Sequence, residues 1–265
     1  MPGRCSTRRK TAPGGADSRG AVAESSEQAG ARLAAQLRRV TELRRQARAH
    51  AELGDAHLAL KAWQAARLAR TYPDLLAHPR YGDAARFFFD ELYGGRDYTQ
   101  RDADVARILP KLIAMLPAAA LSVIADAVEL DALSEDLDMQ MTIRLGGAGA
   151  AGLDDASYCD AFRACGTREA RAHQLFLMRH IGDALDRLTR MPLLATTLKL
   201  MRGPARMAGL GALQEFLERG FHAFKAMRGA ETFLATIEGR EGRLLANIYA
   251  GAQDPFAGLI GQQVS

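Results

Sequence analysis

Residues 84–95 read AARFFFDELYGG, a run of three phenylalanines followed by two acidic residues and, further on, a pair of glycines. Successive side chains on an α-helix are about 100° apart, so three neighbours cannot all face one surface. Phe88 falls on an apolar stripe and Phe89 lies at its edge, but Phe87 points about 140° away from the centre of the stripe. A helix over residues 81–93 therefore either packs on more than one side or exposes Phe87 as an anchor for a partner.

The rest of the sequence has the composition of a helical protein. Alanine, leucine and arginine dominate the 265 residues, whereas the β-branched and aromatic residues typical of strands are scarce. Apolar residues recur at three- and four-residue steps, and no segment alternates apolar and polar positions. We therefore predict an all-α fold, a bundle of roughly ten helices preceded by a disordered N-terminal tail.

The helices are expected to form one compact domain between two tails. Residues 1–26 are rich in small and basic residues without periodicity, which predicts a disordered basic tail. Residues 27–145 form an N-terminal helical region with the FFFDELY motif, and residues 153–251 form a C-terminal one. The segment GGAGAAG at 146–152 is the best candidate for an internal linker, and residues 252–265 are expected to be a flexible tail.

Glycines, prolines and polar caps predict where helices end. Gly54 is expected to stop the first helix and Asp55 to cap the second, so that the two form an antiparallel hairpin. A kink or break is expected at Pro110, a break at Pro204 and a helix start capped by Ser134.

Charge is unevenly distributed along the chain. Residues 1–80 hold 15 basic and 7 acidic residues, a net charge of +8, whereas residues 81–160 hold 6 basic and 15 acidic residues, a net charge of −9. Residues 161–265 carry +5, from 14 basic and 9 acidic residues. The basic first helix could contact the phosphates of a nucleic acid, although it lacks aromatic residues for stacking on bases. Alternatively, it pairs with the acidic middle third inside one fold.

The sequence offers little catalytic chemistry. No Glu-x-x-His pair, phosphate-binding loop or Gly-x-Ser-x-Gly motif is present, so neither a metal site nor a catalytic residue is predicted. The glycines at 147–152 match Gly-x-Gly-x-x-Gly, but they follow a helix rather than the strand that a dinucleotide site needs. Cys5, Cys159 and Cys165 are expected to be free thiols in a reducing cytoplasm.

Two histidines leave a cofactor open as an alternative. His173 and His180 are seven residues apart on one predicted helix, about 10 Å along its axis, which is too far for one metal ion. Either one could instead be an axial ligand of a haem held in the bundle. Outside this alternative, no cofactor is predicted.

Charged residues of alternating sign surround the end of the FFFDELY helix. Thr99 followed by Asp102 matches a capping box, which predicts that the next helix begins near Gln100. The cluster could be an ion-paired helix connection, or it could bind an anionic ligand or the charged surface of a partner. The candidate interaction surface comprises Arg86, Phe87, Tyr93, Arg96, Asp97, Arg101, Asp102, Asp104 and Arg107.

These residues resemble an uncharacterised bacterial family named for its FFLEELY motif, which stands here as FFFDELY at 87–93. The likeness extends through GGRDYTQRDADVARILPKLIAMLP and AVELDALSEDLD, and more loosely through FLERGFHAFKAMRG. Phe89 and Asp90 replace a leucine and a glutamate of the motif. The resemblance implies an all-helical bacterial protein and no assigned activity, so no catalytic residue can be transferred.

No apolar run reaches the roughly 18 residues of a membrane span, and the N-terminus lacks the apolar core of a secretory signal. The expected location is therefore the cytoplasm. The favoured function is a non-enzymatic interaction or regulatory protein that binds a protein partner or a second copy of itself. A bundle that encloses a small apolar ligand or cofactor, with or without enzymatic activity, is the first alternative. Weak nucleic-acid binding is the second.

Overall fold

The computed structural model describes residues 24–49, 51–93, 99–116 and 118–259, and over these residues it is entirely helical, with no strand. The all-α prediction is therefore confirmed. Nearly all of the expected N-terminal tail lies outside the described residues. The first helix begins at Ser26 because Ser25 and Gln28 cap it reciprocally, through Ser25 N to Gln28 Oε1 at 2.9 Å and Gln28 N to Ser25 Oγ at 3.2 Å.

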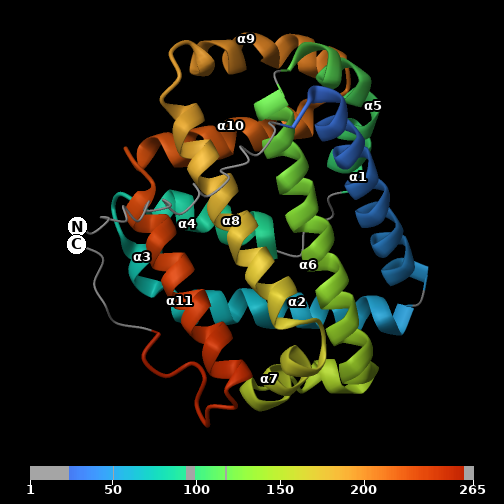
Figure 1. The fold of residues 1–265 in the computed structure, drawn as a ribbon, viewed down its shortest axis with the longest axis vertical. Helices are drawn as coiled ribbons and strands as arrows, with labels where there is room; N and C mark the ends of the chain where they lie inside the picture. Colours follow the sequence, from blue (N-terminus) through green and yellow to red (C-terminus); the bar gives the residue numbers. More distant parts are fainter. Residues whose placement is uncertain (1–23, 50, 94–98, 117, 260–265) are drawn as a thin grey trace, which may run out of the picture.

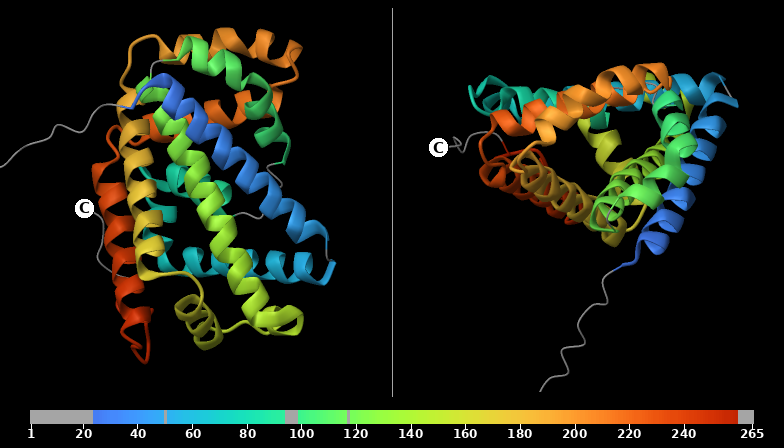
Figure 2. Two further views of the ribbon diagram at one scale, coloured as in Figure 1. Left: turned by 45° about the vertical axis from the view of Figure 1, so that its right-hand side comes forward. Right: turned by 90° about the horizontal axis from the view of Figure 1, so that it is seen from above.

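The part of the chain that the structure describes contains eleven helices (Figure 1). They are α1 Ser26–Ala49, α2 Ala51–Thr71, α3 Pro73–Ala77, α4 Gly82–Tyr93, α5 Thr99–Met115, α6 Ala118–Ala151, α7 Asp155–Ala164, α8 Arg168–Thr189, α9 Leu194–Met207, α10 Gly211–Ala226 and α11 Glu231–Tyr249. The long helix α6 runs between α1 and α8, and α11 lies beyond α8. Helix α2 crosses one end of this layer, whereas α9 and α10 lie at the other end (Figures 1 and 2).

Helix α1 packs along α6, so the hairpin predicted for the first two helices is wrong. Leu33 and Leu37 of α1 are buried in one cluster with Ala125 of α6. The α1–α2 boundary falls near residue 50, and Gly54 and Asp55 lie inside α2. The helix continues through Gly54 because a single glycine costs only about 1 kcal/mol, which the packing of α2 on α6 outweighs.

Two further predicted boundaries are also wrong. Helix α9 continues past Pro204, and the chain turns instead at Gly209, which has φ 71°. Of the kink or break expected at Pro110, the break does not occur, because α5 continues past this residue. Ser134 does not cap a helix, because its hydroxyl donates to the carbonyl of Leu130 in the preceding turn of α6. The glycine-rich segment does disturb α6, whose backbone is non-helical at Gly146.

The three phenylalanines of α4 point at three different parts of the fold. The Phe89 ring lies 5.2 Å from that of Tyr72, at the junction of α2 and α3. The Phe88 ring lies 6.3 Å from that of Phe233 on α11, and the Phe87 ring 5.7 Å from that of Phe216 on α10. Helix α4 is therefore packed on more than one side, and Phe87 is half-buried between helices.

The main core joins the two halves of the chain across the glycine-rich segment. It contains residues of α2, α4 and α6 together with residues of α8, α10 and α11. Gly182 lets α8 and α11 approach closely, because a Cβ at this position would stand 2.4 Å from Leu234 Cδ2. The described helices include none that is long and apolar enough to cross a membrane.

Arginines of the basic first helix pair with acidic residues of α6. Arg32 pairs with Asp126 at 2.6 Å and with Glu129 at 3.1 Å, and Arg39 pairs with Asp136. Positive charges of the basic first third of the sequence therefore pair with negative charges of the acidic middle third inside the fold.

Candidate functional site

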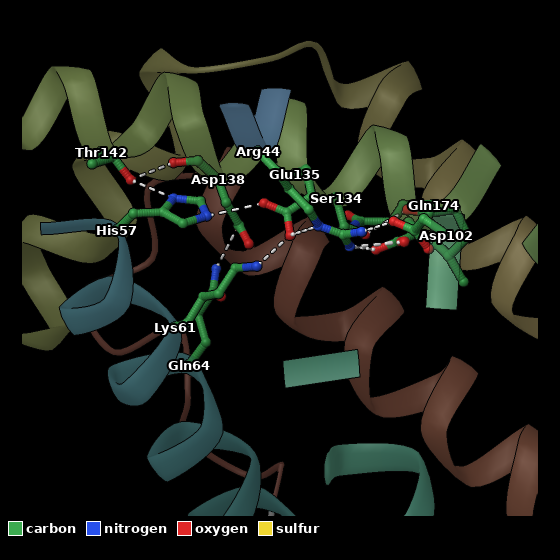
Figure 3. Close-up of polar contacts among 12 residues, drawn as sticks. Arg44, His57, Lys61, Gln64, Asp102, Ser134, Glu135, Asp138, Thr142 and Gln174 are labelled. Atoms are coloured by element: carbon green, nitrogen blue, oxygen red, sulfur yellow. Dashed lines mark hydrogen bonds and ion pairs between the residues drawn. The ribbon is translucent and has the colours of Figure 1, made fainter. Parts of the chain in front are cut away.

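Helix α6 carries a row of polar residues on the face that it turns towards α1 and α2. Asp131, Glu135, Asp138 and Thr142 follow one another at three- and four-residue steps, so they share one side of the helix. Helix α2 places His57, Lys61 and Gln64, at the same three- and four-residue steps, opposite this row (Figure 3). Helix α1 contributes Arg44. Most of these side chains are buried, so their hydrogen bonds decide whether the network stabilises the fold.

Glu135 is the centre of this network. Its carboxylate lies 3.0 Å from Nε2 of His57, 2.5 Å from Nζ of Lys61 and 3.4 Å from Nε of Arg44. Burial alone would raise the pKa of Glu135, but the hydrogen bond from His57 and the charge of Lys61 outweigh burial and hold the pKa well below its usual range.

His57 links Glu135 to the next turn of α6. Its Nδ1 lies 3.1 Å from Oγ1 of Thr142, and that hydroxyl is 2.7 Å from the carbonyl oxygen of Asp138. Since the hydroxyl donates to the carbonyl, it accepts from the ring, and both ring nitrogens of His57 face acceptors.

Arg44 ties three helices together at the other end of the row. Its guanidinium pairs with Asp102 of α5, with Asp131 of α6 at 2.8 Å and with Glu135. An arginine can satisfy several carboxylates at once because its five N–H groups point in fixed directions. Arg44 therefore connects α1, α5 and α6 through its ion pairs.

A cavity of about 70 Å³ lies beside this network, on the side of α6 that faces the C-terminal helices. Gln64 reaches from the network to the cavity, and its Nε2 donates to Oδ1 of Asp138 at 2.8 Å. Across the cavity, Arg67 pairs with Glu241 at 2.5 Å, and the hydroxyl of Tyr72 donates to the same carboxylate at 2.8 Å. The polar residues of the lining are Gln64, Arg67, Ser134, Asp138, Tyr158, Arg171, Gln174 and Glu241.

The two cysteines that the structure describes, Cys159 and Cys165, have buried and unreactive thiols. Burial raises the pKa of Cys159 to about 11, and burial also raises the pKa of Cys165. Both thiols are free and buried. Over the described ranges, no three histidine, cysteine, aspartate or glutamate side chains are grouped so that they could hold a metal ion.

The two histidines that left haem open as an alternative lie on the outside of α8. His173 pairs with Glu129 at 2.8 Å, and His180 lies 3.4 Å from Asp126. Both rings stack on Phe176, which is itself exposed. The two side chains thus join α8 to α6 at the surface.

The residues of the predicted interaction surface that the structure describes differ in exposure and in their partners. Arg86 is exposed and pairs with Asp83, and Phe87 is covered by α10. Asp102 and Asp104 are buried, and Asp102 pairs with Arg44. Exposed Arg107 pairs with Asp104 and donates to the carbonyl of Gly209. The remaining predicted residues have side chains outside the described part: Tyr93, Arg96, Asp97 and Arg101.

A different surface, formed by α9 and the residue before it, carries unusually exposed apolar residues. Leu193, which precedes the helix, is 76% exposed, and Leu200 and Met207 of α9 are 72% and 85% exposed. Met201 beside them is 47% exposed. We call these four residues the α9 outer face. The helix lies at one end of the molecule, with α10 beneath it (Figure 1). Leu200 and Met207 of α9 are seven residues apart and so share one side of the helix, which is the sequence signal for this stripe.

Comparison with known proteins places the chain in one family and no further. A family model described as a domain of unknown function (DUF8198) matches residues 43–255. No curated protein and no solved structure matches the chain.

Proposed function

The chain belongs to the DUF8198 family, a domain of unknown function, and we propose that it is a non-enzymatic interaction protein of the bacterial cytoplasm. Its α9 outer face binds an acidic amphipathic segment of a partner protein. The observation that carries the proposal is the pattern of α9, a helix that is apolar on two opposite sides.

One apolar side of α9 is used within the fold. Ala205 is buried, and Gln214 of α10 donates to the carbonyl of Leu198 at 2.7 Å, so this side lies on α10. Leu200 is two residues from Leu198, about 200° around the helix, and therefore points away from α10. Exposed apolar side chains that gather on one surface often mark an interaction site, so the α9 outer face has the character of a surface that another molecule covers.

The charge around the α9 outer face indicates the chemistry of that molecule. Residues 187–228 contain eight basic and two acidic residues, a net charge of +6. One of the acidic residues, Glu218, is engaged by Arg202 at 2.5 Å. An acidic partner would gain both encounter rate and specificity from this field. Leucine and methionine anchors at heptad spacing suit an amphipathic helix, because methionine adapts its shape to the partner.

Other surfaces favour the remaining hypotheses less. Basic residues of α1 were expected to contact nucleic acid, but Arg32, Arg39 and Arg44 pair with carboxylates of α6 instead. The α9 outer face lacks the aromatic side chains that anchor amphipathic helices at membrane interfaces. The FFFDELY motif lies within the residues matched by the family model, and we infer that this chain shares its fold with the FFLEELY proteins that it resembles.

Crosslinking of the full chain in lysate of its native organism, followed by mapping of the crosslinked peptides, tests the proposal. We expect Leu200→Glu and Met207→Glu each to abolish one specific crosslink, whose partner segment is an amphipathic helix with acidic residues. A synthetic peptide of that segment should bind the purified chain and lose affinity as salt increases.

Leu58→Glu on α2 and Ile143→Glu on α6 are matched controls, since these side chains are 55% and 63% exposed elsewhere on the surface. Both controls should keep the crosslink. Equal loss in the controls, binding of anionic vesicles in place of the peptide, or a dimer that Leu200→Glu dissociates would each overturn the proposal.

A further inference from the structure

We propose that the groove between α8 and α11 binds the side chain of an arginine, presented by an exposed segment of a partner protein. The groove has a volume of about 360 Å³. It is separate from the α9 outer face and from the interaction proposed there. Three features point to this ligand: apolar walls, an open space above a glycine and a surplus of negative charge.

The walls of the groove are largely apolar. Helices α8 and α11 run side by side (Figure 1), and Leu175 and Phe176 of α8 and Leu245 of α11 line the space between them. Phe176 is 59% exposed, and its ring stacks with those of His173 and His180, at 6.1 and 5.8 Å between ring centres. Long basic side chains bury their methylene groups on apolar surfaces and leave the charged end free to meet water or a carboxylate. The walls therefore suit the stem of an arginine.

Gly242 of α11 keeps the groove open. This residue lines the groove, and a Cβ built on it would meet no atom within 4 Å. An engineered cavity of about 150 Å³ holds the six non-hydrogen atoms of benzene, so a space of about 360 Å³ holds roughly fourteen such atoms. An arginine residue has eleven, its backbone included. The groove therefore has room for one arginine, and the rest of the partner segment lies outside it.

Around Arg179 the groove carries an excess of carboxylates. The guanidinium of this residue pairs with Asp183 at 3.0 Å, with Glu231 at 2.7 Å and with Glu238 at 3.2 Å. Three negative charges thus share one positive charge, which leaves a net charge of −2 at neutral pH. The side chains of Glu231 and Glu238 are 77% and 50% exposed, so their oxygens can accept further hydrogen bonds. A second cation beside Arg179 is therefore favoured by charge.

Arginine suits this groove better than lysine does. A guanidinium is planar, donates in fixed directions and lies flat against aromatic rings, whereas the ammonium group of lysine is a compact and strongly hydrated point charge. The carboxylates of Asp183 and Glu238 and the ring of Phe176 line the same groove, so one arginine can contact both kinds of group. His180 also lines the groove, but it lies 3.4 Å from Asp126, which offsets its charge when the ring is protonated.

Nuclear magnetic resonance titration of the full chain with N-acetyl-arginine amide tests the site. We expect saturable shifts of the signals of Leu175, Phe176 and Leu245. N-acetyl-citrulline amide has almost the same shape without the charge, and it should bind at least about tenfold more weakly. N-acetyl-lysine amide should also bind more weakly than the arginine compound. Equal binding of either analogue, or no saturable shift with the arginine compound, would overturn the proposal.

Two variants with matched controls separate the groove from a general attraction of cations to the protein surface. Gly242→Leu fills the groove without changing its charge and should lower the affinity for N-acetyl-arginine amide about tenfold or more. Gly239→Leu, three residues earlier on α11, also has open space at its Cβ but does not line the groove, so it should bind as the wild type does. Glu238→Gln should likewise lower the affinity, whereas Glu215→Gln, exposed on α10, should not.

Urea unfolding shows which of these variants fold. If either Gly242→Leu or Glu238→Gln does not fold, the other decides the result. Unchanged affinity in a folded Gly242→Leu or Glu238→Gln protein, or an equal loss in the controls, would contradict the assignment.

A photo-crosslinking amino acid in place of Leu245 of the full chain identifies the natural occupant in lysate of the native organism. The mapped partner segment should contain an arginine within a few residues of the crosslink. The crosslink should disappear when Gly242→Leu is added and should persist with Leu200→Glu, which alters the α9 outer face instead. A crosslink to a second copy of the chain, or to a segment without arginine, would show that the groove has a different occupant and would refute the proposal.

Discussion

The ring of Phe87 lies directly over Gly220. A Cβ built on that glycine would stand 2.9 Å from Cζ of the ring, closer than side chains normally approach. The contact explains how α10 covers the one phenylalanine of α4 that its apolar stripe leaves out. The absence of a side chain at Gly220 therefore leaves the space that the Phe87 ring occupies.

The contact predicts a coupling between the two positions. Gly220→Ala should destabilise the protein by about 1–3 kcal/mol because the methyl group displaces the ring. In a Phe87→Ala background the same substitution should be neutral or stabilising by up to about 1 kcal/mol, since alanine favours the helix once the ring is absent. Urea unfolding of the four proteins gives the coupling energy as a double-mutant cycle.

Gly239→Ala is the control for this cycle. It lies inside α11, and a Cβ there meets no atom within 4 Å. We expect this substitution to stabilise the protein by about 0.5–1 kcal/mol in either background. Additive effects at Phe87 and Gly220 would show that the two residues do not determine each other.

The buried carboxylate of Glu135 predicts how stability depends on pH. Its pKa in the folded protein lies below the value of about 4.3 for an unfolded glutamate, so the unfolded state binds more protons at acidic pH. The stability that Glu135 contributes is therefore fully present above about pH 4.3 and is lost as the pH falls towards the folded pKa. Glu135→Gln should cost about 3 kcal/mol near neutral pH and give a smaller loss of stability on acidification.

Glu42→Gln is the comparison for Glu135, and denaturant unfolding at a series of pH values is the measurement. Hydrogen bonds from Arg45 and Gln46 lower the pKa of Glu42 to about 2, but its ion pair lies in solvent, where the interaction is screened. The variant should follow the wild-type curve closely. A Glu135→Gln protein with the full acid dependence of the wild type would contradict the assignment.

The pKa of Cys159 predicts low thiol reactivity. At pH 8 a thiol with a pKa of about 11 is almost entirely protonated, and it is the thiolate that reacts. In a Cys5→Ser background, Ellman's reagent should therefore label neither Cys159 nor Cys165 in the folded protein and both in denaturant. Rapid labelling without denaturant would show that α7 opens on the time scale of the assay.

Periodicity predicted the helices and their apolar stripes, but it could not predict their partners. The stripe with Leu33 and Leu37 is buried as expected, yet it packs on α6 because Arg32 and Arg39 find carboxylates there. Proline and glycine signals failed where packing outweighed them, as at Gly54 inside α2. A glycine inside a helix costs only about 1 kcal/mol of helix stability, and the packing of α2 on α6 contributes more than that.

The two polar sites were hidden from sequence reasoning for a physical reason. Glu135 and Asp138 recur at helical spacing, and a polar row of that kind is normally a solvated face. Only the matching row on α2, with His57 and Lys61, makes it an interior network. For Phe87, the direction of the side chain on its helix could be predicted from the sequence. Its packing partner Gly220 could not, because it lies 133 residues further along the chain.

Arg240 fixes α11 against the junction of α2 and α3, and it predicts a large loss of stability on truncation. Its side chain is buried, and its guanidinium binds both carboxylate oxygens of Asp74, at 2.7 and 2.6 Å, and the carbonyl of Thr71 at 3.0 Å. Arg240→Ala should cost about 3–5 kcal/mol because these acceptors lose their donors. Arg240→Lys should recover only part of the loss, since an ammonium cannot form the two parallel bonds.

Arg243→Ala, exposed on the same helix, is the control and should change the free energy of unfolding by no more than about 0.5 kcal/mol. A lysine that restored full stability would show that charge alone, rather than the paired geometry with Asp74, holds α11 in place.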